Sequence, residues 1–170
     1  MRLILIISFV LFSIPISFSI EAPDDFKKYI SGKTVAITDG DTFKLLTPDS
    51  TLYRVRLANI DCPERRQPFS KRAKQFASDA IFGKEVCIEV LSTDRNGRLI
   101  ANVFYDANLV LNEEFLKAGL AWHFRRYSRD PGLQQLEDRA RKAKVGLWIT
   151  QDAVPPWEWR SSKRVKAGDR

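Results

Sequence analysis

Acidic residues and arginines are concentrated in three short stretches that have the composition of turns. The first contains Asp39, Gly40 and Asp41, where the glycine permits a tight reversal after an apolar run. The second runs from Arg56 to Glu64, and the third is the segment 94–98, Asp-Arg-Asn-Gly-Arg. Side chains of these types are charged at neutral pH, so the three stretches are where this sequence could bind or transform a charged ligand.

Two of the carboxylates form a candidate metal site. Asp41 and Asp61 follow different apolar runs, and neither a histidine nor a paired cysteine accompanies them. Oxygen donors without sulfur or imidazole suit Ca²⁺ or Mg²⁺ better than zinc or copper. Glu64, three residues after Asp61, could orient or deprotonate a water molecule near such an ion.

Arg56 and Arg98 supply the complementary chemistry. A guanidinium group binds two phosphate oxygens at once and stabilises the charge that builds on them in a transition state. A metal ion, a base and two arginines together describe the hydrolysis of a phosphodiester. Taken singly, each motif has a simpler explanation, because Asp-Gly is common in hairpin turns and a strand can carry an arginine on its surface.

The hydrophobic pattern predicts the elements that must position these residues. Alternating or apolar runs between turn residues predict strands over 33–37, 43–46, 52–57, 85–91 and 100–104. Apolar residues at helical spacing predict helices over 70–82, over 111–118 and from Pro131, after an Asp130 cap, to Gly146. We therefore expect an α+β domain, a small antiparallel β-barrel with helices packed on its open side.

The overall composition is typical of one folded domain. The chain has 170 residues, of which 44% are hydrophobic, and a formal net charge of +7. This content excludes a wholly disordered, collagen-like or coiled-coil protein. The basic excess favours an anionic partner such as nucleic acid, although it also suits a soluble basic protein.

Residues 1–19 predict an export signal. A positive start at Arg2, an apolar run over 3–16 and the small residues at 17–19 fit a cleavable signal peptide. We expect a secreted or periplasmic protein; the alternative is an uncleaved membrane anchor.

The remaining chain divides into three parts. We expect a lead-in at 20–32, the folded domain at 33–150, and at 151–170 a docked Trp-containing clasp followed by a frayed basic tail. Cys62 and Cys87 could form a disulfide after export, and the sequence leaves their pairing open.

The stretch from about Val35 to Trp148 resembles the thermonuclease family, whose type member is staphylococcal nuclease. The shared motifs are Ile-Thr-Asp-Gly-Asp-Thr at 37–42, the segment 55–64, Thr-Asp-Arg-Asn-Gly-Arg at 93–98, and Gly-Leu-Ala at 119–121 before Tyr127. The resemblance implies a five-stranded OB-fold Greek-key β-barrel with three packed α-helices. It also implies a secreted, Ca²⁺-dependent endonuclease that hydrolyses phosphodiester bonds of DNA and RNA and leaves 3′-phosphate ends.

The resemblance assigns the metal ligands. Asp41 and Asp61 would bind Ca²⁺, with the backbone carbonyl of Cys62 as the third protein ligand. The position of Cys62 is commonly Thr in the family, but a carbonyl ligand does not depend on the side chain.

The resemblance also assigns the catalytic residues. Glu64 would act on the attacking water, while Arg56 and Arg98 would clamp the scissile phosphate. We expect single-stranded or denatured DNA and RNA as substrates, a monomer, and no obligate protein partner.

The substrate contacts depart from the family pattern. Asn96 and Arg125 stand where the type member has tyrosines that contact the nucleotide. The candidate substrate-binding residues are therefore Tyr127, which can stack on a base, and Arg125 and Arg95, which can hold phosphate.

Two other functions stay open at this point. A non-catalytic OB-fold module at the cell surface could bind nucleic acid without cleaving it, because a fold alone does not prove a function. A structural protein held at the surface by its N-terminal helix is the second alternative. A degenerate binding module would be expected to lose at least one charged site residue, whereas this sequence keeps all five: Asp41, Arg56, Asp61, Glu64 and Arg98.

Overall fold

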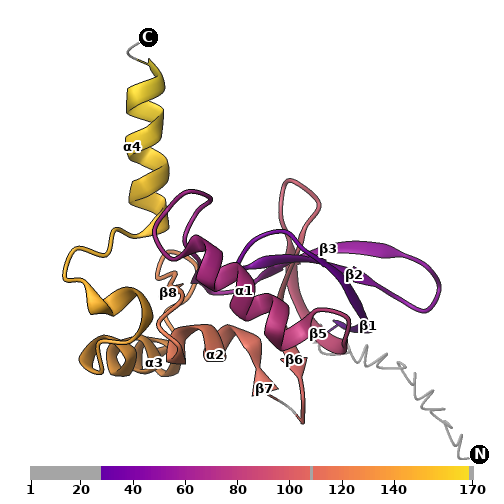
Figure 1. Cartoon of the computed structure of the whole chain (residues 1–170). Coiled ribbons are helices and arrows are strands. Elements are labelled where there is room, and N and C mark those ends of the chain that lie inside the picture. The colour runs from indigo at the N-terminus through magenta and orange to yellow at the C-terminus, as the bar shows by residue number, and fades with distance from the viewer. Residues whose placement is uncertain (1–27, 108, 169–170) are drawn as a thin grey trace, which may run out of the picture.

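The computed structural model of the chain describes residues 28–107 and 109–168. The predicted signal peptide at 1–19 and most of the lead-in at 20–32 lie outside these residues. In Figure 1 a twisted β-barrel forms one side of the molecule, helices cover the other side, and the C-terminal helix extends away from both. Within the described ranges, no helix is long and apolar enough to cross a membrane.

Five strands close the barrel, in agreement with the five that the sequence predicts. The neighbour order is β3-β2-β1-β5-β6, and a parallel pairing of β3 with β6 completes the ring, while the other pairings are antiparallel. The first strand extends the predicted segment 33–37 toward the N-terminus. The strands are β1 (Lys28–Ile37), β2 (Thr42–Leu46), β3 (Leu52–Leu57), β5 (Glu85–Thr93) and β6 (Leu99–Tyr105).

Three further strands are only two residues long. β4 (Ile60–Asp61) pairs with β8 (Trp122–His123) in a separate sheet, and β7 (Leu109–Val110) pairs with the end of β6. The pairing of β4 with β8 places Asp61 opposite Trp122. It therefore ties the acidic segment after β3 to the chain that follows α2.

Alternation along β3 places one predicted site residue outside the core. Val55 and Leu57 are buried in the barrel, while Arg56 points to the opposite face of the strand. The same alternation buries Phe43 and Leu45 in β2.

Helices α1 (Ser70–Ile81), α2 (Leu111–Lys117) and α3 (Pro131–Lys142) confirm the three predicted helices. Ala73, Ala77 and Ile81 form the buried face of α1. At the start of α3 the side chain of Asp130 accepts a hydrogen bond from the backbone of Gly132 at 2.7 Å, which is the predicted cap. The third helix ends at Lys142, before the predicted end at Gly146, and a separate 3₁₀ helix, η1 (Gly146–Ile149), follows it.

The structure differs from the sequence-based expectation at the C-terminus, where it adds a helix to the three that the pattern predicts. A fourth helix, α4, runs over Pro156–Gly168. Proline is favourable at the first position of a helix, where its missing N–H costs no hydrogen bond. The start of α4 is docked on the body of the protein, because the ring of Trp157 stacks on that of Phe124 with centroids 5.3 Å apart and planes 2° apart.

A buried asparagine fixes the turn that leads to the acidic segment. The side-chain amide of Asn112 in α2 donates to the carbonyls of Ala58, at 2.9 Å, and Ala101, at 3.2 Å. Its side-chain oxygen accepts the backbone N–H of Val103 at 3.0 Å. Helix α2 therefore holds β6 and the turn after β3 together through one side chain.

Gly146 is a position where a side chain would disrupt the fold. Its φ is +58°, and an added Cβ would lie 2.2 Å from the carbonyl oxygen of Gly119. We expect Gly146→Ala to lower the free energy of unfolding by about 2–4 kcal/mol, measured by urea denaturation, because neither the backbone nor that carbonyl can move freely.

Gly83→Ala is the matched control for this prediction. Gly83 has a φ of +75° but open space around the added Cβ. Gly83→Ala should lower the free energy of unfolding by only about 1–2 kcal/mol, which is the cost of placing a side chain in the left-handed conformation. Equal losses at Gly83 and Gly146 would show that the contact with Gly119 does not matter.

Candidate active site

The loop before β2 and the segment after β3 meet at one end of the barrel. The backbone N–H of Cys62 donates to the Asp41 carboxylate at 3.0 Å, and the backbone N–H of Leu57 donates to the Asp41 carbonyl at 2.8 Å. Gly40 makes this approach possible, because an added Cβ would lie 2.9 Å from the Cβ atoms of both Cys62 and Ala73. The close packing of these two segments brings Asp41 and Asp61 together.

Arg56 joins the two aspartates. Its Nη1 lies 2.7 Å from Oδ2 of Asp41 and its Nη2 lies 2.8 Å from Oδ1 of Asp61. The three side chains are largely buried, with exposed fractions of 14% for Arg56, 11% for Asp41 and 2% for Asp61. Burial alone would lower the pKa of the Arg56 guanidinium, but the charges of Asp41 and Asp61 raise it. Arg56 is therefore a permanent cation at this site.

The same geometry suits a divalent cation with oxygen ligands. Both carboxylates reach one guanidinium group, so they are close enough to share a single small cation. Carboxylate oxygens are hard donors of the kind that Ca²⁺ and Mg²⁺ prefer. Among the residues that the structure describes, no group of three or more acidic, cysteine or histidine side chains converges as a ready metal site. A cation bound here would therefore need further oxygen ligands besides the two carboxylates.

A third aspartate adds negative charge to this end of the barrel. Asp39 lies beside Asp41, whose backbone N–H donates to its carboxylate at 3.3 Å. Burial and repulsion by the Asp41 carboxylate raise the pKa of Asp39 to about 6. The folded protein therefore keeps the Asp39 proton to a higher pH than the unfolded chain does, so this group contributes stability that is present below pH 4 and is lost as the pH rises from about 4 to about 6.

Glu64 lies in the turn after β4 and contacts a residue that the sequence analysis did not place in the site. Nη1 of Arg160, in α4, lies 2.5 Å from a Glu64 carboxylate oxygen, and its Nη2 lies 2.8 Å from Oδ2 of Asp61. The sequence pattern predicts that the segment containing Arg160 is a docked clasp, with no role in the site. Its Trp-Glu-Trp-Arg motif, following two prolines, was the signal that this segment is docked, but it does not indicate the contact with Glu64.

Arg98 does not join this cluster of charged side chains. It lies at the end of the hairpin between β5 and β6, where its Nε and Nη2 contact the carboxylate of Asp94 at 2.9 and 2.8 Å. Asp94 also accepts the backbone N–H groups of Asn96 and Arg98, each at 2.9 Å. The hairpin therefore fixes Arg98 by its own hydrogen bonds.

The hairpin carboxylate has an unusually low pKa. Burial would raise the pKa of Asp94, but the backbone and side-chain hydrogen bonds from Arg98 and the backbone hydrogen bond from Asn96 lower it to about 2. Ionised Asp94 should therefore stabilise the fold above pH 5, and this contribution should vanish as the pH falls from 4 toward 2. We expect Asp94→Asn to lower the free energy of unfolding by about 1 kcal/mol at pH 7 and by much less near pH 2.5.

Urea denaturation of both proteins at the two pH values measures this difference. Asp138→Asn, on the exposed face of α3, is a suitable control. If Asp94→Asn lowers the free energy of unfolding equally at both pH values, the stabilisation does not come from the low pKa of Asp94.

A groove of about 1400 Å³ contains all the predicted site residues. Its lining includes Asp41, Asp61 and Glu64, together with Arg56 and Arg98. The groove thus combines a buried acidic centre with a basic surround. The three candidate substrate-binding residues, Arg95, Arg125 and Tyr127, line the same groove.

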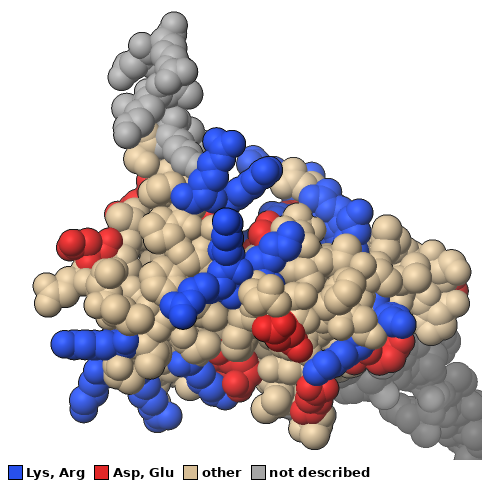
Figure 2. All heavy atoms as spheres, viewed as in Figure 1, with Lys and Arg blue, Asp and Glu red and all other residues tan. Residues whose placement is uncertain are grey.

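The rim of the groove carries cations and exposed aromatic surface. Tyr127 is 70% exposed, and its ring meets that of Phe124 edge-on with centroids 4.9 Å apart. The guanidinium of Arg126 lies 5.9 Å from the centre of the Tyr127 ring. Figure 2 shows that lysine and arginine side chains also gather over α1 and the loop before it. This face therefore favours an anionic polymer.

No role in this chemistry is assigned to the cysteine thiols or to the histidine ring. Cys62 and Cys87 are both free, so they form no disulfide. Burial and the Asp41 carboxylate raise the pKa of the Cys62 thiol, which leaves it a weak nucleophile at neutral pH. His123 is buried, and its ring contacts the side chain of Gln134 at 3.1 Å.

Comparison with known proteins adds independent findings. The family model for staphylococcal nuclease homologues matches residues 54–150. An uncharacterized endonuclease of Escherichia coli O157:H7 is 36% identical over 134 residues, which cover 79% of this chain and 87% of that protein. An uncharacterized endonuclease of Haemophilus influenzae is 35% identical, with 78% and 74% covered. The staphylococcal-like nuclease CAN1 of Arabidopsis thaliana is 38% identical over 66% of this chain and 34% of its own length.

Proposed function

This chain belongs to the family of staphylococcal nuclease homologues, and from that membership and its charged groove we infer that it is a nuclease that hydrolyses phosphodiester bonds. Its substrate is accordingly a nucleic acid. The observation that carries the inference is the meeting of Asp41, Arg56, Asp61 and Glu64 at one end of the barrel, in a groove that also contains Arg98.

Calcium is the metal that this site would use. Asp41, Asp61 and the carbonyl of Cys62 would hold the ion, and this donor set of hard oxygens supports the assignment. A bound Ca²⁺ supplies positive charge next to the phosphate and lowers the cost of the charge that develops there. The two carboxylates that would hold the ion are those that Arg56 contacts in this structure, so a bound ion would supply the positive charge there and would leave Arg56 available for the phosphate.

The chain's own residues perform the other steps. Glu64 accepts a proton from the attacking water, because its carboxylate lies at the groove beside Asp61. Arg56, on β3, and Arg98, in the hairpin between β5 and β6, stabilise the phosphate oxygens through bidentate hydrogen bonds. Asp94 keeps Arg98 oriented toward the groove.

The basic rim supports single-stranded or denatured DNA and RNA as substrates. Arg95 and Arg125 would hold backbone phosphates, and Tyr127 would stack on a base. These contacts do not distinguish one base from another, so cleavage should tolerate many sequences. Following the family resemblance, we assign 3′-phosphate product ends and action as a monomer.

Export is part of the proposal. Residues 1–19 have the sequence pattern of a signal peptide, which supports a secreted or periplasmic enzyme, or a membrane-anchored one if the signal is retained. The second candidate function is a non-catalytic OB-fold module that binds nucleic acid at the cell surface. The complete set of charged site residues favours the nuclease over the binding module.

The experiment that tests the nuclease is release of acid-soluble nucleotides from denatured DNA and from RNA. The purified mature chain is assayed with Ca²⁺, with Mg²⁺ and with excess chelator. Activity that requires Ca²⁺ would support both the reaction and the metal. A folded protein that binds DNA but releases nothing under any of these conditions would support the binding module instead.

A further inference from the structure

Arg160 contacts the active site from outside the part of the chain that matches the family model. That match ends at residue 150, whereas Arg160 lies in the first turns of α4. Its guanidinium lies 2.5 Å from Glu64 and 2.8 Å from Asp61 through two different nitrogens. A second contact with Asp61, at 3.4 Å, completes the bridge.

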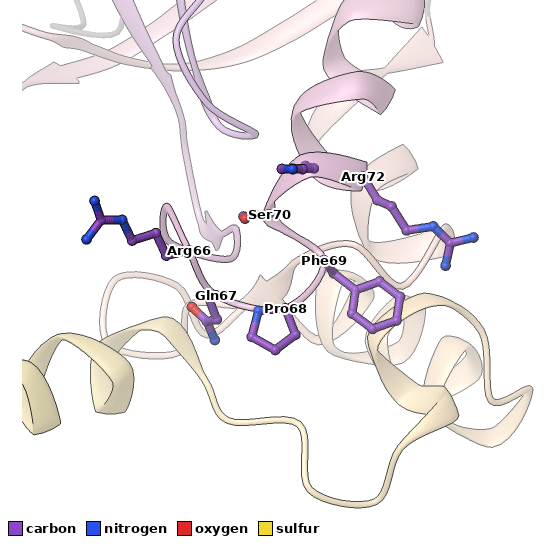
Figure 3. Close-up of a pocket in the computed structure, with 7 residues that line it drawn as sticks. Arg66, Gln67, Pro68, Phe69, Ser70 and Arg72 are labelled. Atoms are coloured by element: carbon purple, nitrogen blue, oxygen red, sulfur yellow. The ribbon is translucent and has the colours of Figure 1, made fainter.

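The segment that carries Arg160 is anchored close to the same turn. Gln67, which is buried, donates from its side-chain nitrogen to the carbonyl of Val154 at 2.6 Å. Its side-chain oxygen accepts the backbone N–H of Glu64 at 2.9 Å. Figure 3 shows Gln67 and Pro68 pointing toward the chain that leads into α4. One side chain thus links the turn of Glu64 to the segment that delivers Arg160.

Packing restricts the start of α4 further. Pro156 is buried, and Trp157 stacks on Phe124 next to the groove. Arg160 lies one turn after Trp157, so both side chains face the body of the protein. The guanidinium is therefore held in place by the fold and is 35% exposed toward the groove.

Glu64 needs such a partner. Its side chain is 37% exposed on a turn, whereas Asp61 is almost fully buried. Two carboxylates that lie this close repel one another, and an exposed glutamate has many rotamers. A guanidinium between them removes the repulsion and fixes the direction of the Glu64 carboxylate, because its two nitrogens bind in a fixed fork.

We propose that Arg160 is a positioning residue for the hydrolysis described above: its guanidinium holds the Glu64 carboxylate beside Asp61 in the orientation needed to act on water. This inference rests on the proposed nuclease function. It makes the C-terminal segment 151–162 a part of the active site. Arg160 acts through Glu64, and we assign it no contact with the scissile phosphate.

The test is Arg160→Ala in the full mature chain, assayed for kinetics and for Ca²⁺ binding. We expect kcat to fall about 10- to 100-fold, as is typical of a misplaced catalytic group, with KM within about threefold of wild type. Ca²⁺ affinity, measured by calorimetric titration without substrate, should be unchanged or slightly tighter, because the variant removes a positive charge near the metal ligands and none of the ligands themselves. Arg139→Ala, an exposed arginine of α3, is the matched control and should leave both quantities unchanged.

Chemical rescue distinguishes positioning from a structural role. Guanidinium ion at low millimolar concentration should restore part of the kcat of Arg160→Ala, and it should not affect Arg139→Ala. Wild-type kcat in Arg160→Ala would overturn the proposal, as would a rise in KM alone, which would assign Arg160 to substrate binding. Loss of Ca²⁺ binding without any rescue would overturn it in favour of a purely structural role.

The outcome for the wild-type chain separates this inference from the proposed function. If the wild-type chain cleaves DNA and Arg160→Ala cleaves it equally well, only the role of Arg160 fails. If the wild-type chain binds Ca²⁺ and DNA but cleaves neither DNA nor RNA, the nuclease assignment fails and the role of Arg160 fails with it.

Discussion

Glu64→Gln should reduce kcat on denatured DNA by about 10²- to 10⁴-fold, the range typical of losing a general base. The amide cannot accept a proton from water at neutral pH, but it has nearly the same shape as the carboxylate. Its oxygen can still accept a hydrogen bond from Arg160, which now lies 2.5 Å from Glu64. We therefore expect the fold, the thermal stability and the DNA affinity of this variant to stay close to wild type.

Glu158→Gln is the control for this substitution. Glu158 is an exposed glutamate in the first turn of α4, so the variant makes the same change in charge near the same segment. It should keep wild-type kcat. Initial rates at saturating DNA, with filter binding of a labelled oligonucleotide as the second measurement, compare the three proteins. A rate above one tenth of wild type for Glu64→Gln would remove Glu64 from the mechanism.

Arg56→Gln should have the largest effect on stability. In the absence of metal it leaves Asp41, which is 11% exposed, without its ion-pair partner, while Asp61 keeps only its contact with Arg160. Removing one partner of a buried ion pair costs about 3–5 kcal/mol, because the remaining charge is desolvated and has lost its counter-charge. Urea denaturation in excess chelator should show this loss, and added Ca²⁺ should restore part of it by taking the place of the missing cation.

Arg54→Gln provides the comparison on the same strand. Arg54 is exposed on β3, so its replacement should change the free energy of unfolding by less than about 0.5 kcal/mol. Activity should follow the same division, with turnover abolished in the Arg56 variant and preserved in the Arg54 variant. Equal stability of the two variants in chelator would mean that the bridge between Asp41 and Asp61 contributes nothing to the fold.

Most of the fold could be predicted because its elements follow simple periodic patterns. Strands β2 and β3 alternate buried and exposed residues, and α1 buries residues at helical spacing. The first part of β1 could not be predicted in this way, because its inward positions include Gly32 and Thr34, which are buried but give no hydrophobic signal in the sequence. Its register comes from pairing with β5, which is a property of the folded barrel.

Helix α4 was missed for a related reason. Its sequence is strongly polar after Trp159, so it gives no clear amphipathic pattern and suggests a frayed tail. The two prolines before the tryptophans are a start signal for a helix, but they are equally common in extended segments. What holds the beginning of α4 in place is packing of Trp157 on Phe124, a contact between distant parts of the chain.

Part of the site could be predicted from local sequence motifs, whereas the contact made by Arg160 could not. The motifs around Asp41, Arg56, Asp61 and Glu64 are local, and their convergence could be expected from the family resemblance. Arg160 lies 96 residues from Glu64 in sequence, and no periodicity or spacing connects the two. Such a contact becomes visible only when the chain is folded.

The closure of the barrel also determines when during folding the site can exist. Hairpins such as β2–β3 and β5–β6 join neighbouring segments, whereas the parallel pairing of β3 with β6 joins segments far apart in sequence. Distant pairings cost chain entropy before their contacts offset it, which slows their formation. Arg56 lies on that seam, opposite Ile100. If the hairpins form before this seam closes, the chain at that stage would carry the charged residues without the complete arrangement around Arg56, and we would expect it to be inactive.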